Sequence, residues 1–564
     1  MIGSKERPYD LVVIGGGING AGVARDASMR GMRVALFEMR DVSTGATWAS
    51  SGMIHGGLRY LKYDPEVTRL ACLDSGYIQA IAPHLIFRIP FLLPWSEGGL
   101  SSKVVFELAE VYFDTYDRYQ PLKRGRQHCR LTPEEVRHVE PGIRGGILGA
   151  VTMDEWGIDA QRLTVVNAVD AAKHGADIHT YTRVEKLLRD GDRVVGVRVS
   201  DRLGGGPREV FAKTVLNATG PWAMQTAQRE GVSRVKVRPG KGVHLVLAGR
   251  VTNYAVISKA IDGREIFICP QQNTTLVGTT DDDYYGDLED IPVLHDEVEY
   301  LLQGVERNFP KIRDYPIIHT TVGCRATLHE YGKYESDLSR EHEVFDHARD
   351  GAAGFYSLAG GKLASYRVMA EEATDVLAEA VGNRVECRTH REAMPGGEAH
   401  DLTEAAFVEL GVPALAARRI LYRQGSDASR VLEMMRAEPR TRAIVDPCEP
   451  VTDAELRVAM RHEIVRTLDD LKRRCRLGVG ADGGARCAAR AAQIFCEEKE
   501  LPASDLPDVA AAFLQMRWQD RRGVLRGPMR ISEELQQSWV HLATQLEQRG
   551  PSVDLDRTLA TEGT

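Results

Sequence analysis

The chain has 564 residues, so we expect two or three domains rather than one compact core. A formal net charge of -8 and a pI near 6.1 argue against a general nucleic-acid-binding protein. No apolar run approaches the roughly 18 residues of a membrane span, and the first residues predict no secretory signal. The most apolar stretch, residues 83–95, is short and broken by prolines and Arg88, so it is either a buried segment, which we favour, or one that dips into a bilayer surface. Nine cysteines in so long a chain form no dense disulfide pattern, which suits a reducing cytoplasm.

A glycine-rich turn follows the first apolar run of the chain. Residues 10–14 read DLVVI, as a strand buried on both faces should, and Gly15, Gly17 and Gly20 follow with the spacing GxGxxG. A helical segment, residues 21–30, comes next, and a second apolar run, residues 33–37, then ends on Glu38. This order of strand, turn, helix and strand is the context in which the glycine spacing predicts a dinucleotide site.

Each part of this unit has a role in binding a dinucleotide. Gly15 permits the tight turn, Gly17 lets a pyrophosphate approach the backbone, and Gly20 lets helix and strand pack closely. The helix N-terminus stabilises the phosphate charge, and Glu38 can accept hydrogen bonds from the ribose hydroxyls. The cofactor contacts predicted here are Ile14, Gly15, Gly16, Gly17, Ile18, Asn19, Gly20 and Glu38.

Three further segments suit a flavin rather than a nicotinamide cofactor. Residues 45–60 (GATWASSGMIHGGLRY) form a small-residue loop, residues 214–223 (TVLNATGPWA) a strand with a small-residue turn, and residues 355–366 (FYSLAGGKLASY) a strand, turn and helix start. A flavoenzyme that wraps one extended cofactor uses separated segments of this kind. The additional cofactor contacts predicted from them are Thr47, Ser51, Ala218, Thr219, Gly220, Gly360, Gly361, Lys362 and Leu363.

With these motifs the sequence resembles the FAD-dependent glycerol-3-phosphate dehydrogenases, a branch of the D-amino-acid-oxidase-like flavoproteins. The motifs run in family order: VIGGGINGAGVARDA near the start, IHGGLRY at 54–60, NATGPWA at 217–223, KGVH at 241–244, GTTD at 278–281 and GGKLASYR at 360–367. The resemblance implies an α/β fold, with a Rossmann-type FAD-binding domain, an antiparallel β substrate-binding domain and a helical C-terminal domain. The strand-like runs within residues 235–320 alternate as an antiparallel sheet should.

The domains expected from this fold are discontinuous in sequence. Residues 1–80, 150–235 and 320–390 are assigned to FAD binding, residues 80–150 and 235–320 to the substrate domain, and residues 400–564 to the helical domain. Residues 394–400 (MPGGEAH) have the composition of a linker.

The resemblance also implies a substrate site for glycerol 3-phosphate. Arg59 and Arg325 are the expected phosphate ligands, because a planar guanidinium matches phosphate oxygens, and Lys362 is expected beside the reactive face of the flavin. His55 is the first choice for the base because imidazole titrates near neutral pH, and His244 is the competing choice. Tyr60 and Thr280 are expected as hydrogen-bonding neighbours.

Two positions depart from the family pattern. Ala326 follows Arg325 in VGCRATL, where the family has roughly SGVRPL, and Gly52 stands where the quinone-reducing enzymes usually carry a lysine. The first departure concerns the context of Arg325 as a phosphate ligand, and the second concerns the details of the loop beside the flavin.

The tail resembles the C-terminal part of the anaerobic type of these dehydrogenases, whose catalytic subunit works with partner subunits. That region carries four cysteines suited to a two-iron two-sulfur cluster. Here Cys448 and Cys487 are kept, but Asp446 and Asp482 occupy the other two positions. Carboxylate is a harder ligand than thiolate, so neither a normal iron–sulfur cluster nor another metal is expected.

A local signal in the tail predicts a helix start. Thr452 and Glu455 have the spacing of a capping box, just before Leu456 and Met460 on one helical face. Two basic clusters, residues 123–130 and 472–476, are each predicted to be a solvated face, with the first also a candidate membrane contact.

The remaining expectations concern cofactor, acceptor and location. We expect a non-covalent FAD, a quinone or an iron–sulfur partner subunit to accept the electrons, a homo-oligomer, and a cytoplasmic protein peripherally bound to the inner face of the cell membrane. The nearest alternative is a glycerol-3-phosphate oxidase that reduces oxygen. More distant alternatives are an amine or hydroxy-acid oxidase of the same superfamily, and a flavin-containing assembly module whose helical tail is the working part.

Overall fold

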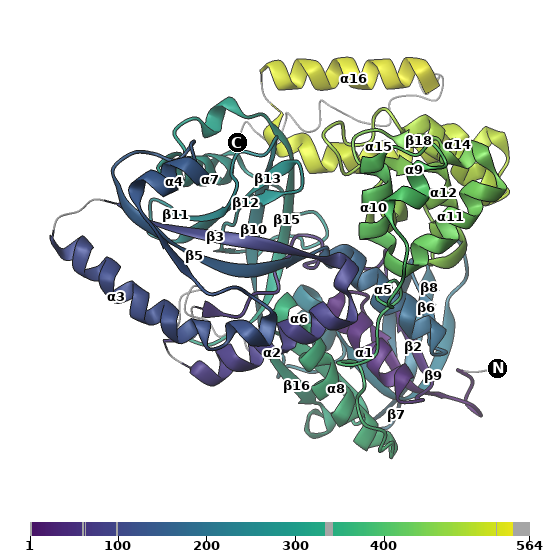
Figure 1. The fold of residues 1–564 in the computed structure, drawn as a ribbon. Helices are drawn as coiled ribbons and strands as arrows, with labels where there is room; N and C mark the ends of the chain where they lie inside the picture. The colour runs from purple at the N-terminus through teal and green to yellow at the C-terminus, as the bar shows by residue number, and fades with distance from the viewer. Residues whose placement is uncertain are drawn as a thin grey trace. The chain divides into compact units, whose positions relative to one another are not determined.

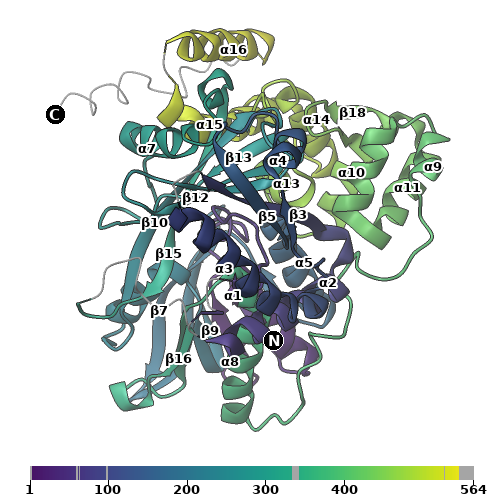
Figure 2. The ribbon, with the colours of Figure 1, turned by 60° about the vertical axis from the view of Figure 1, so that its left-hand side comes forward.

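The computed structural model describes residues 3–58, 61–62, 64–96, 100–332, 342–525 and 527–544 (Figures 1 and 2). The chain divides into two compact units. The first comprises Met1–Ile317 and Thr321–Ala399, and the second comprises Ile318–Thr320 and His400–Thr564. Among the described residues, no helix combines the length and apolar character needed to cross a membrane.

One sheet of the first unit is built around the strand that precedes the glycine turn. β1 (Tyr9–Ile14) lies between β2 (Val34–Phe37) and β9 (Arg208–Asn217) and is parallel to both. β17 (Phe355–Gly360) pairs in parallel with β9. The carboxyl ends of β1, β9 and β17 therefore meet at one edge, where open α/β sheets bind ligands. The sheet is completed by β6 (Asp177–His179), β7 (Thr182–Asp190), β8 (Arg193–Asp201) and β16 (His342–Asp346).

Three helices cover a face of this sheet. α1 (Ile18–Met29) packs against both α5 (Ala160–Lys173) and α8 (Tyr366–Val381), and Figures 1 and 2 show α1 beside α8. Gly22 allows the close approach to α8, because a Cβ there would lie 3.1 Å from the Cβ of Ala370. A buried ion pair of 2.6 Å between Arg25 and Asp170 joins α1 to α5. The helix after the glycine turn is thus fixed on both sides.

The second sheet of the same unit is mainly antiparallel, as the alternating runs predict. Residues 83–95 lie mostly in its strand β3 (Ile86–Ser96). Two predicted domain limits, at residues 150 and 320, fall inside strands of this sheet, β5 (Ile147–Ile158) and β15 (Ile317–Leu328). The other strands are β4 (Cys129–Leu131), β10 (Val237–Ala248), β11 (Ala255–Lys259), β12 (Glu265–Gln271), β13 (Thr274–Gly278) and β14 (Asp282–Asp283). The remaining helices of the unit are α2 (Pro65–Ile81), α3 (Leu100–Asp117), α4 (Pro133–Val139), α6 (Ala223–Arg229) and α7 (His295–Glu306).

The second unit is helical, as predicted for the tail. Its elements are α9 (Glu404–Val408), α10 (Ala414–Gln424), α11 (Ala428–Ala437), β18 (Ile444–Asp446), β19 (Val451–Thr452), α12 (Asp453–His462), α13 (Leu471–Cys475), α14 (Ala488–Glu498), α15 (Leu506–Arg521) and α16 (Pro528–Thr544).

The predicted capping box of α12 is only half formed. The Thr452 hydroxyl accepts a hydrogen bond of 3.3 Å from the Glu455 N–H, which caps the helix. The Glu455 carboxylate instead forms a buried ion pair of 2.6 Å with Arg423. A buried arginine needs a carboxylate partner, and this need outweighs a cap that the local sequence also permits.

The two basic clusters are not simply solvated faces, so that prediction is wrong at several positions. Lys123 is fully buried and forms an ion pair of 2.6 Å with Glu155. Lys472, Arg473 and Arg474 are also buried, and the first two pair with acidic residues of the preceding turn. Each burial depends on acidic or backbone partners.

All nine cysteines are free thiols. Cys129 is exposed, Cys448 is half-buried and the other seven are buried.

Candidate active site

A cavity of about 300 Å³ opens beside the glycine turn. Gly15 has a φ of +106°, and a Cβ there would lie 2.7 Å from the Ala218 carbonyl oxygen. A Cβ on Gly20 would lie 2.0 Å from the Gly15 carbonyl oxygen, so helix and strand could not pack. Gly17 lines the cavity, and a Cβ there would meet only the Thr47 hydroxyl, at 3.6 Å. The space over Gly17 can therefore admit a ligand.

Glu38 lies at the end of β2 and lines the same cavity. Its carboxylate accepts hydrogen bonds from the backbone N–H groups of Gly16, at 2.7 Å, and Arg40, at 2.9 Å. Burial raises the pKa of Glu38, and the two N–H groups oppose that shift. A carboxylate has about four acceptor positions, so capacity remains for the hydroxyls of a ribose.

Most of the predicted cofactor contacts line this cavity, but some do not. Ile14, Gly15, Gly17, Ile18, Asn19, Glu38, Thr47, Ala218, Thr219 and Gly220 line it, and Thr47 also accepts a hydrogen bond of 3.2 Å from the Ile18 N–H. The predicted contacts that are not among the described residues lining it are Gly16, Gly20, Ser51, Gly360, Gly361, Lys362 and Leu363. Gly360 is the last residue of β17, and Gly361, Lys362 and Leu363 follow it, at the edge where β1 and β9 also end.

His244 and Ser51 join the second sheet to the loop that follows β2. His244 Nε2 on β10 lies 2.9 Å from the Ser51 hydroxyl oxygen. Burial, together with the charge of Arg325, lowers the pKa of His244 to about 3. His244 faces Gly278 of β13, where a Cβ would lie 2.3 Å from the imidazole. The structure therefore holds a neutral imidazole in a tightly packed site.

Arg325 on β15 is held beside His244 by a loop after β13. Its guanidinium donates to the Asp281 carboxylate at 2.7 Å and to the Thr280 carbonyl oxygen at 3.2 Å. The Thr280 hydroxyl accepts from the Val243 N–H at 3.0 Å, which ties the loop to β10. Thr280 thus binds Arg325 through its carbonyl oxygen and binds β10 through its hydroxyl group.

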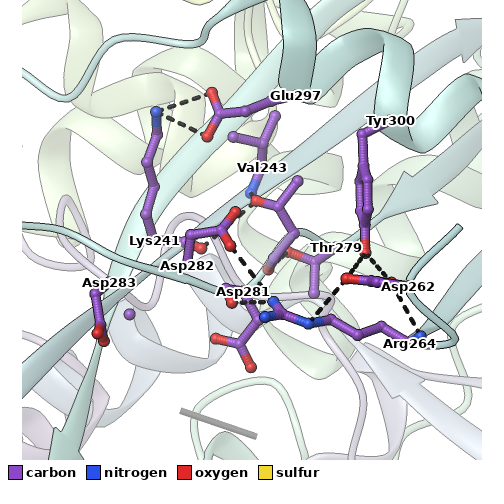
Figure 3. A network of polar contacts seen from close by, with 12 residues as sticks. Lys241, Val243, Asp262, Arg264, Thr279, Asp281, Asp282, Asp283, Glu297 and Tyr300 are labelled. Atoms are coloured by element: carbon purple, nitrogen blue, oxygen red, sulfur yellow. Dashed lines mark hydrogen bonds and ion pairs between the residues drawn. The ribbon is translucent and has the colours of Figure 1, made fainter. Parts of the chain in front are cut away.

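Further ion pairs and hydrogen bonds surround the same loop, as Figure 3 shows. Lys241 points to Glu297 of α7, with an ion pair of 2.8 Å. Arg264 donates to the Asp281 carbonyl oxygen and pairs with Asp262 at 3.2 Å. Asp281 ends the GTTD motif, but the motif alone does not reveal that its carboxylate faces Arg325.

His55 lies in the loop of residues 54–58 and is half-buried. Its Nδ1 accepts a hydrogen bond of 3.1 Å from the Gly57 N–H, so a neutral ring carries its proton on Nε2. To act as a base in this state, His55 has to accept the proton on Nδ1, the nitrogen that accepts from the Gly57 N–H, so that hydrogen bond has to open. Arg59 and Tyr60 lie outside the described residues.

Three of the four family cluster positions of the tail come together in the second unit. One ligand atom each of Asp446, Cys448 and Asp482 lies within 4.8 Å of the others. The Asp446 carboxylate accepts from the N–H groups of Cys448 and Gly478, each at 2.8 Å. The Asp482 carboxylate accepts from the Gly484 N–H at 3.0 Å. A two-iron two-sulfur cluster takes four thiolates, so these residues do not fit it.

Comparison with known proteins covers both units. A family model described as FAD dependent oxidoreductase matches residues 10–367, and one described as the C-terminal domain of alpha-glycerophosphate oxidase matches residues 387–504. A subunit of the anaerobic glycerol-3-phosphate dehydrogenase of Escherichia coli (strain K12) is 32% identical over 537 residues, covering 94% of this chain and 96% of that protein. The aerobic glycerol-3-phosphate dehydrogenase of Bacillus subtilis (strain 168) is 31% identical over 453 residues, covering 77% of this chain and 80% of that protein.

A solved structure extends the similarity to the fold. The X-ray structure of the glycerol-3-phosphate dehydrogenase from Bacillus halodurans, complexed with FAD, has a TM-score of 0.72 and 26% identity, covering 93% of this chain and 97% of that one. The glycine turn, the open space over Gly17 and the position of Glu38 fit the adenosine and pyrophosphate parts of FAD. Since the dehydrogenases of Escherichia coli and Bacillus halodurans each match more than 90% of the chain, it belongs to the family of FAD-dependent glycerol-3-phosphate dehydrogenases.

Proposed function

We propose that this protein oxidises sn-glycerol 3-phosphate to dihydroxyacetone phosphate with a non-covalent FAD. The observation that carries the proposal is the placement of the cationic Arg325 close to the neutral His244, which contacts Ser51 of the loop that follows β2. A phosphorylated secondary alcohol needs a cation for its phosphate and an imidazole near its hydroxyl. The relatives named glycerol-3-phosphate dehydrogenase support the choice of substrate.

Each residue of the candidate site has a proposed role. Arg325 and Arg59 bind the phosphate, and Lys362 lies beside the reactive face of the cofactor. Bound FAD supplies the hydride acceptor. The base that takes the hydroxyl proton is one of two histidines, His55 or His244. Ser51 orients the imidazole of His244. Tyr60 and the backbone of Thr280 complete the polar surroundings.

The two sheets of the first unit divide the work. We assign cofactor binding to the sheet around β1 and substrate binding to the sheet around β10, with the helical unit as a docking or packing element. The relatives that are named as one subunit of an anaerobic enzyme support a partner subunit. In our proposal this partner carries electrons onward, with a quinone as the final acceptor. The proposal includes a homo-oligomer located in the cytoplasm and peripherally bound at the membrane.

Purified protein assayed with glycerol 3-phosphate tests the function. We expect the substrate to bleach the flavin absorption near neutral pH under anaerobic conditions, and a dye or quinone to restore it. Glycerol, which lacks the phosphate, should reduce the flavin far more slowly. A flavin that glycerol 3-phosphate leaves oxidised would contradict the proposal.

The alternative function is an oxidase that passes electrons to oxygen. It is favoured by the match of residues 387–504 to the C-terminal domain of alpha-glycerophosphate oxidase. Hydrogen peroxide formed in stoichiometric amount with dihydroxyacetone phosphate would establish the oxidase. A rate that depends on quinone, with little peroxide, would establish the dehydrogenase.

A further inference from the structure

The loop of residues 54–58 contains His55 but is neither a helix nor a multi-residue strand. Its backbone is held instead by side chains of α2. The Ser75 hydroxyl donates to the Ile54 carbonyl oxygen at 3.0 Å, the Cys72 thiol to that of Gly56 at 3.6 Å, and the Thr68 hydroxyl to that of Gly57 at 3.3 Å. These three donors are four and three residues apart, so they share one face of the helix.

A buried acidic residue holds the other side of the loop. The Gly56 N–H donates to the Glu155 carboxylate at 3.0 Å. The same carboxylate pairs with Lys123 at 2.6 Å and accepts from the Tyr116 hydroxyl at 2.6 Å. Lys123 in turn donates to the Tyr116 oxygen at 2.9 Å. Glu155, Lys123 and Tyr116 are at most 2% exposed.

Gly56 is therefore held from both sides at once. Cys72 bonds its carbonyl and Glu155 bonds its N–H. A Cβ on Gly56 would lie 2.4 Å from both the Cys72 sulfur and the Tyr116 oxygen. Burial raises the pKa of Cys72 to about 12, and it raises that of Tyr116 well above its ordinary value, so both groups stay protonated donors at neutral pH. Cys72 therefore remains a donor to the Gly56 carbonyl oxygen, and Tyr116 a donor to the Glu155 carboxylate.

A buried ion pair is a costly way to stabilise a fold. Removing two charges from water costs several kcal/mol each, and apolar side chains of similar volume often stabilise as well or better. The Glu155–Lys123 pair does something that apolar side chains cannot do, since its carboxylate accepts from a specific backbone N–H of the loop.

We propose that Glu155 is a positioning residue that fixes the backbone around His55 for the oxidation of the substrate, an inference that rests on the proposed function. Glu155 itself contacts Gly56, Lys123 and Tyr116. It acts through the loop. The carboxylate fixes the position of the Gly56 N–H, and the three α2 side chains fix the carbonyl groups of Ile54, Gly56 and Gly57. Together these hydrogen bonds determine the direction in which the His55 imidazole points.

The test compares two variants that each remove a buried ion pair. Glu155→Leu with Lys123→Met removes the proposed anchor, including the acceptor of the Gly56 N–H, and leaves no unpaired buried charge. Glu455→Leu with Arg423→Met removes a pair of the same 2.6 Å length in the helical unit and serves as the matched control. Ser75→Ala is a milder third variant, which deletes one hydrogen bond to the loop and keeps the ion pair.

Two readouts are needed for each variant. Hydrogen–deuterium exchange of the peptide that contains residues 52–58 reports the loop, and kcat and KM for glycerol 3-phosphate report its role. For the Glu155 variant we expect exchange about tenfold faster or more, kcat/KM lowered about tenfold or more, and unchanged FAD per chain. Ser75→Ala should shift both readouts in the same direction by less. The control should lose thermal stability but keep both readouts within about twofold of wild type.

The outcomes separate this inference from the function itself. If glycerol 3-phosphate does not reduce the flavin of the wild-type protein, the proposed function is refuted, while hydrogen exchange still tests whether Glu155 holds the loop. If the wild type is active but the Glu155 variant exchanges the loop amides at the wild-type rate, the positioning role of Glu155 is overturned. Faster exchange with unchanged kcat and KM would show that the anchor is structural only, and a control that loses as much kcat/KM would show a general effect of stability.

Discussion

The Arg325 guanidinium donates a hydrogen bond of 2.7 Å to the Asp281 carboxylate, beside the buried His244. The cation expected to bind phosphate is thus already partly neutralised by an acidic neighbour. A doubly charged phosphate held here needs further positive charge, and Arg59 is the residue that the sequence offers for it. The pair also fixes the guanidinium, so it is oriented before a substrate arrives.

The first prediction concerns phosphate binding by Arg325. Arg325→Ala should raise KM for glycerol 3-phosphate by about 10- to 150-fold, because a charge-assisted hydrogen bond contributes about 1.5–3 kcal/mol. Any slow oxidation of unphosphorylated glycerol should change little. Steady-state kinetics with both substrates measure the difference. Equal losses for both substrates would assign Arg325 to the fold or the cofactor site instead.

The base is assigned by comparing His55→Ala with His244→Ala. The variant that lacks the base should lose kcat with little change in flavin content, and the loss should shrink at high pH, where the substrate hydroxyl needs less help. We expect this from His55→Ala. Rapid-mixing measurements of flavin reduction over a pH series give the comparison. If His244→Ala instead loses more kcat without losing flavin, and the kcat of His55→Ala stays near that of wild type, the base is His244.

His244 also predicts a pH dependence of stability. Its pKa is about 3 in the folded protein and about 6.5 when unfolded, so the unfolded chain binds more protons between these values. The free energy of unfolding should therefore fall as pH falls from about 6.5 towards 3, by up to about 1.4 kcal/mol per pH unit from this residue. His244→Gln should flatten the slope in this window, as measured by denaturant titration. Identical slopes for wild type and variant would contradict the buried neutral imidazole.

The dinucleotide turn is tested by a pair of glycine variants. Gly17→Val should fold, because the Cβ position meets only Thr47 at 3.6 Å, but its side chain should fill the space for the pyrophosphate. We expect colourless protein with a thermal transition. Gly20→Ala should instead fail to fold, since its Cβ would lie 2.0 Å from a backbone oxygen. A yellow Gly17→Val protein with full FAD content would remove this loop from the cofactor site.

The tail is predicted to work without an iron–sulfur cluster. The carboxylates of Asp446 and Asp482 hold backbone N–H groups of their loops, which leaves Cys448 and Cys487 as the only thiols at the four family positions. Anaerobically purified protein should contain FAD, substoichiometric iron and no labile sulfide. Changing Cys448 and Cys487 to Ser should leave dehydrogenase activity intact. If the protein instead contains two iron atoms and two sulfides per chain, and dithionite bleaches the visible absorption of the cluster, the aspartates are cluster ligands.

The parts of the fold that the sequence predicts well are those fixed by local patterns. The apolar runs of residues 10–14 and 33–37 become β1 and β2, because a buried strand is apolar on both faces. The family resemblance is confirmed by relatives that match almost the whole chain. The spacing of Gly15, Gly17 and Gly20 also predicts the turn well, because the close backbone contacts that require glycine there are set by a short stretch of sequence.

What the sequence did not reveal depends on partners far along the chain. Ser51 and His244 are 193 residues apart, and Ser51 was predicted only as a cofactor contact. The burial of Lys123 becomes comprehensible only once Glu155 is placed next to it. No local pattern carries such pairings, and a basic residue without a visible partner is reasonably assigned to the surface.

The burial of most thiols makes this protein suited to measuring local opening one region at a time. A maleimide added to the native protein should modify Cys129 first, because it is the exposed thiol, and the half-buried Cys448 next. The buried thiols can react only when the chain around them opens, so their rates rank the opening free energies. Cys72, Cys269, Cys324 and Cys387 report on the first unit, and Cys475, Cys487 and Cys496 on the helical one. One alkylation time course, resolved by mass spectrometry, would thus show whether the two units unfold together or in turn.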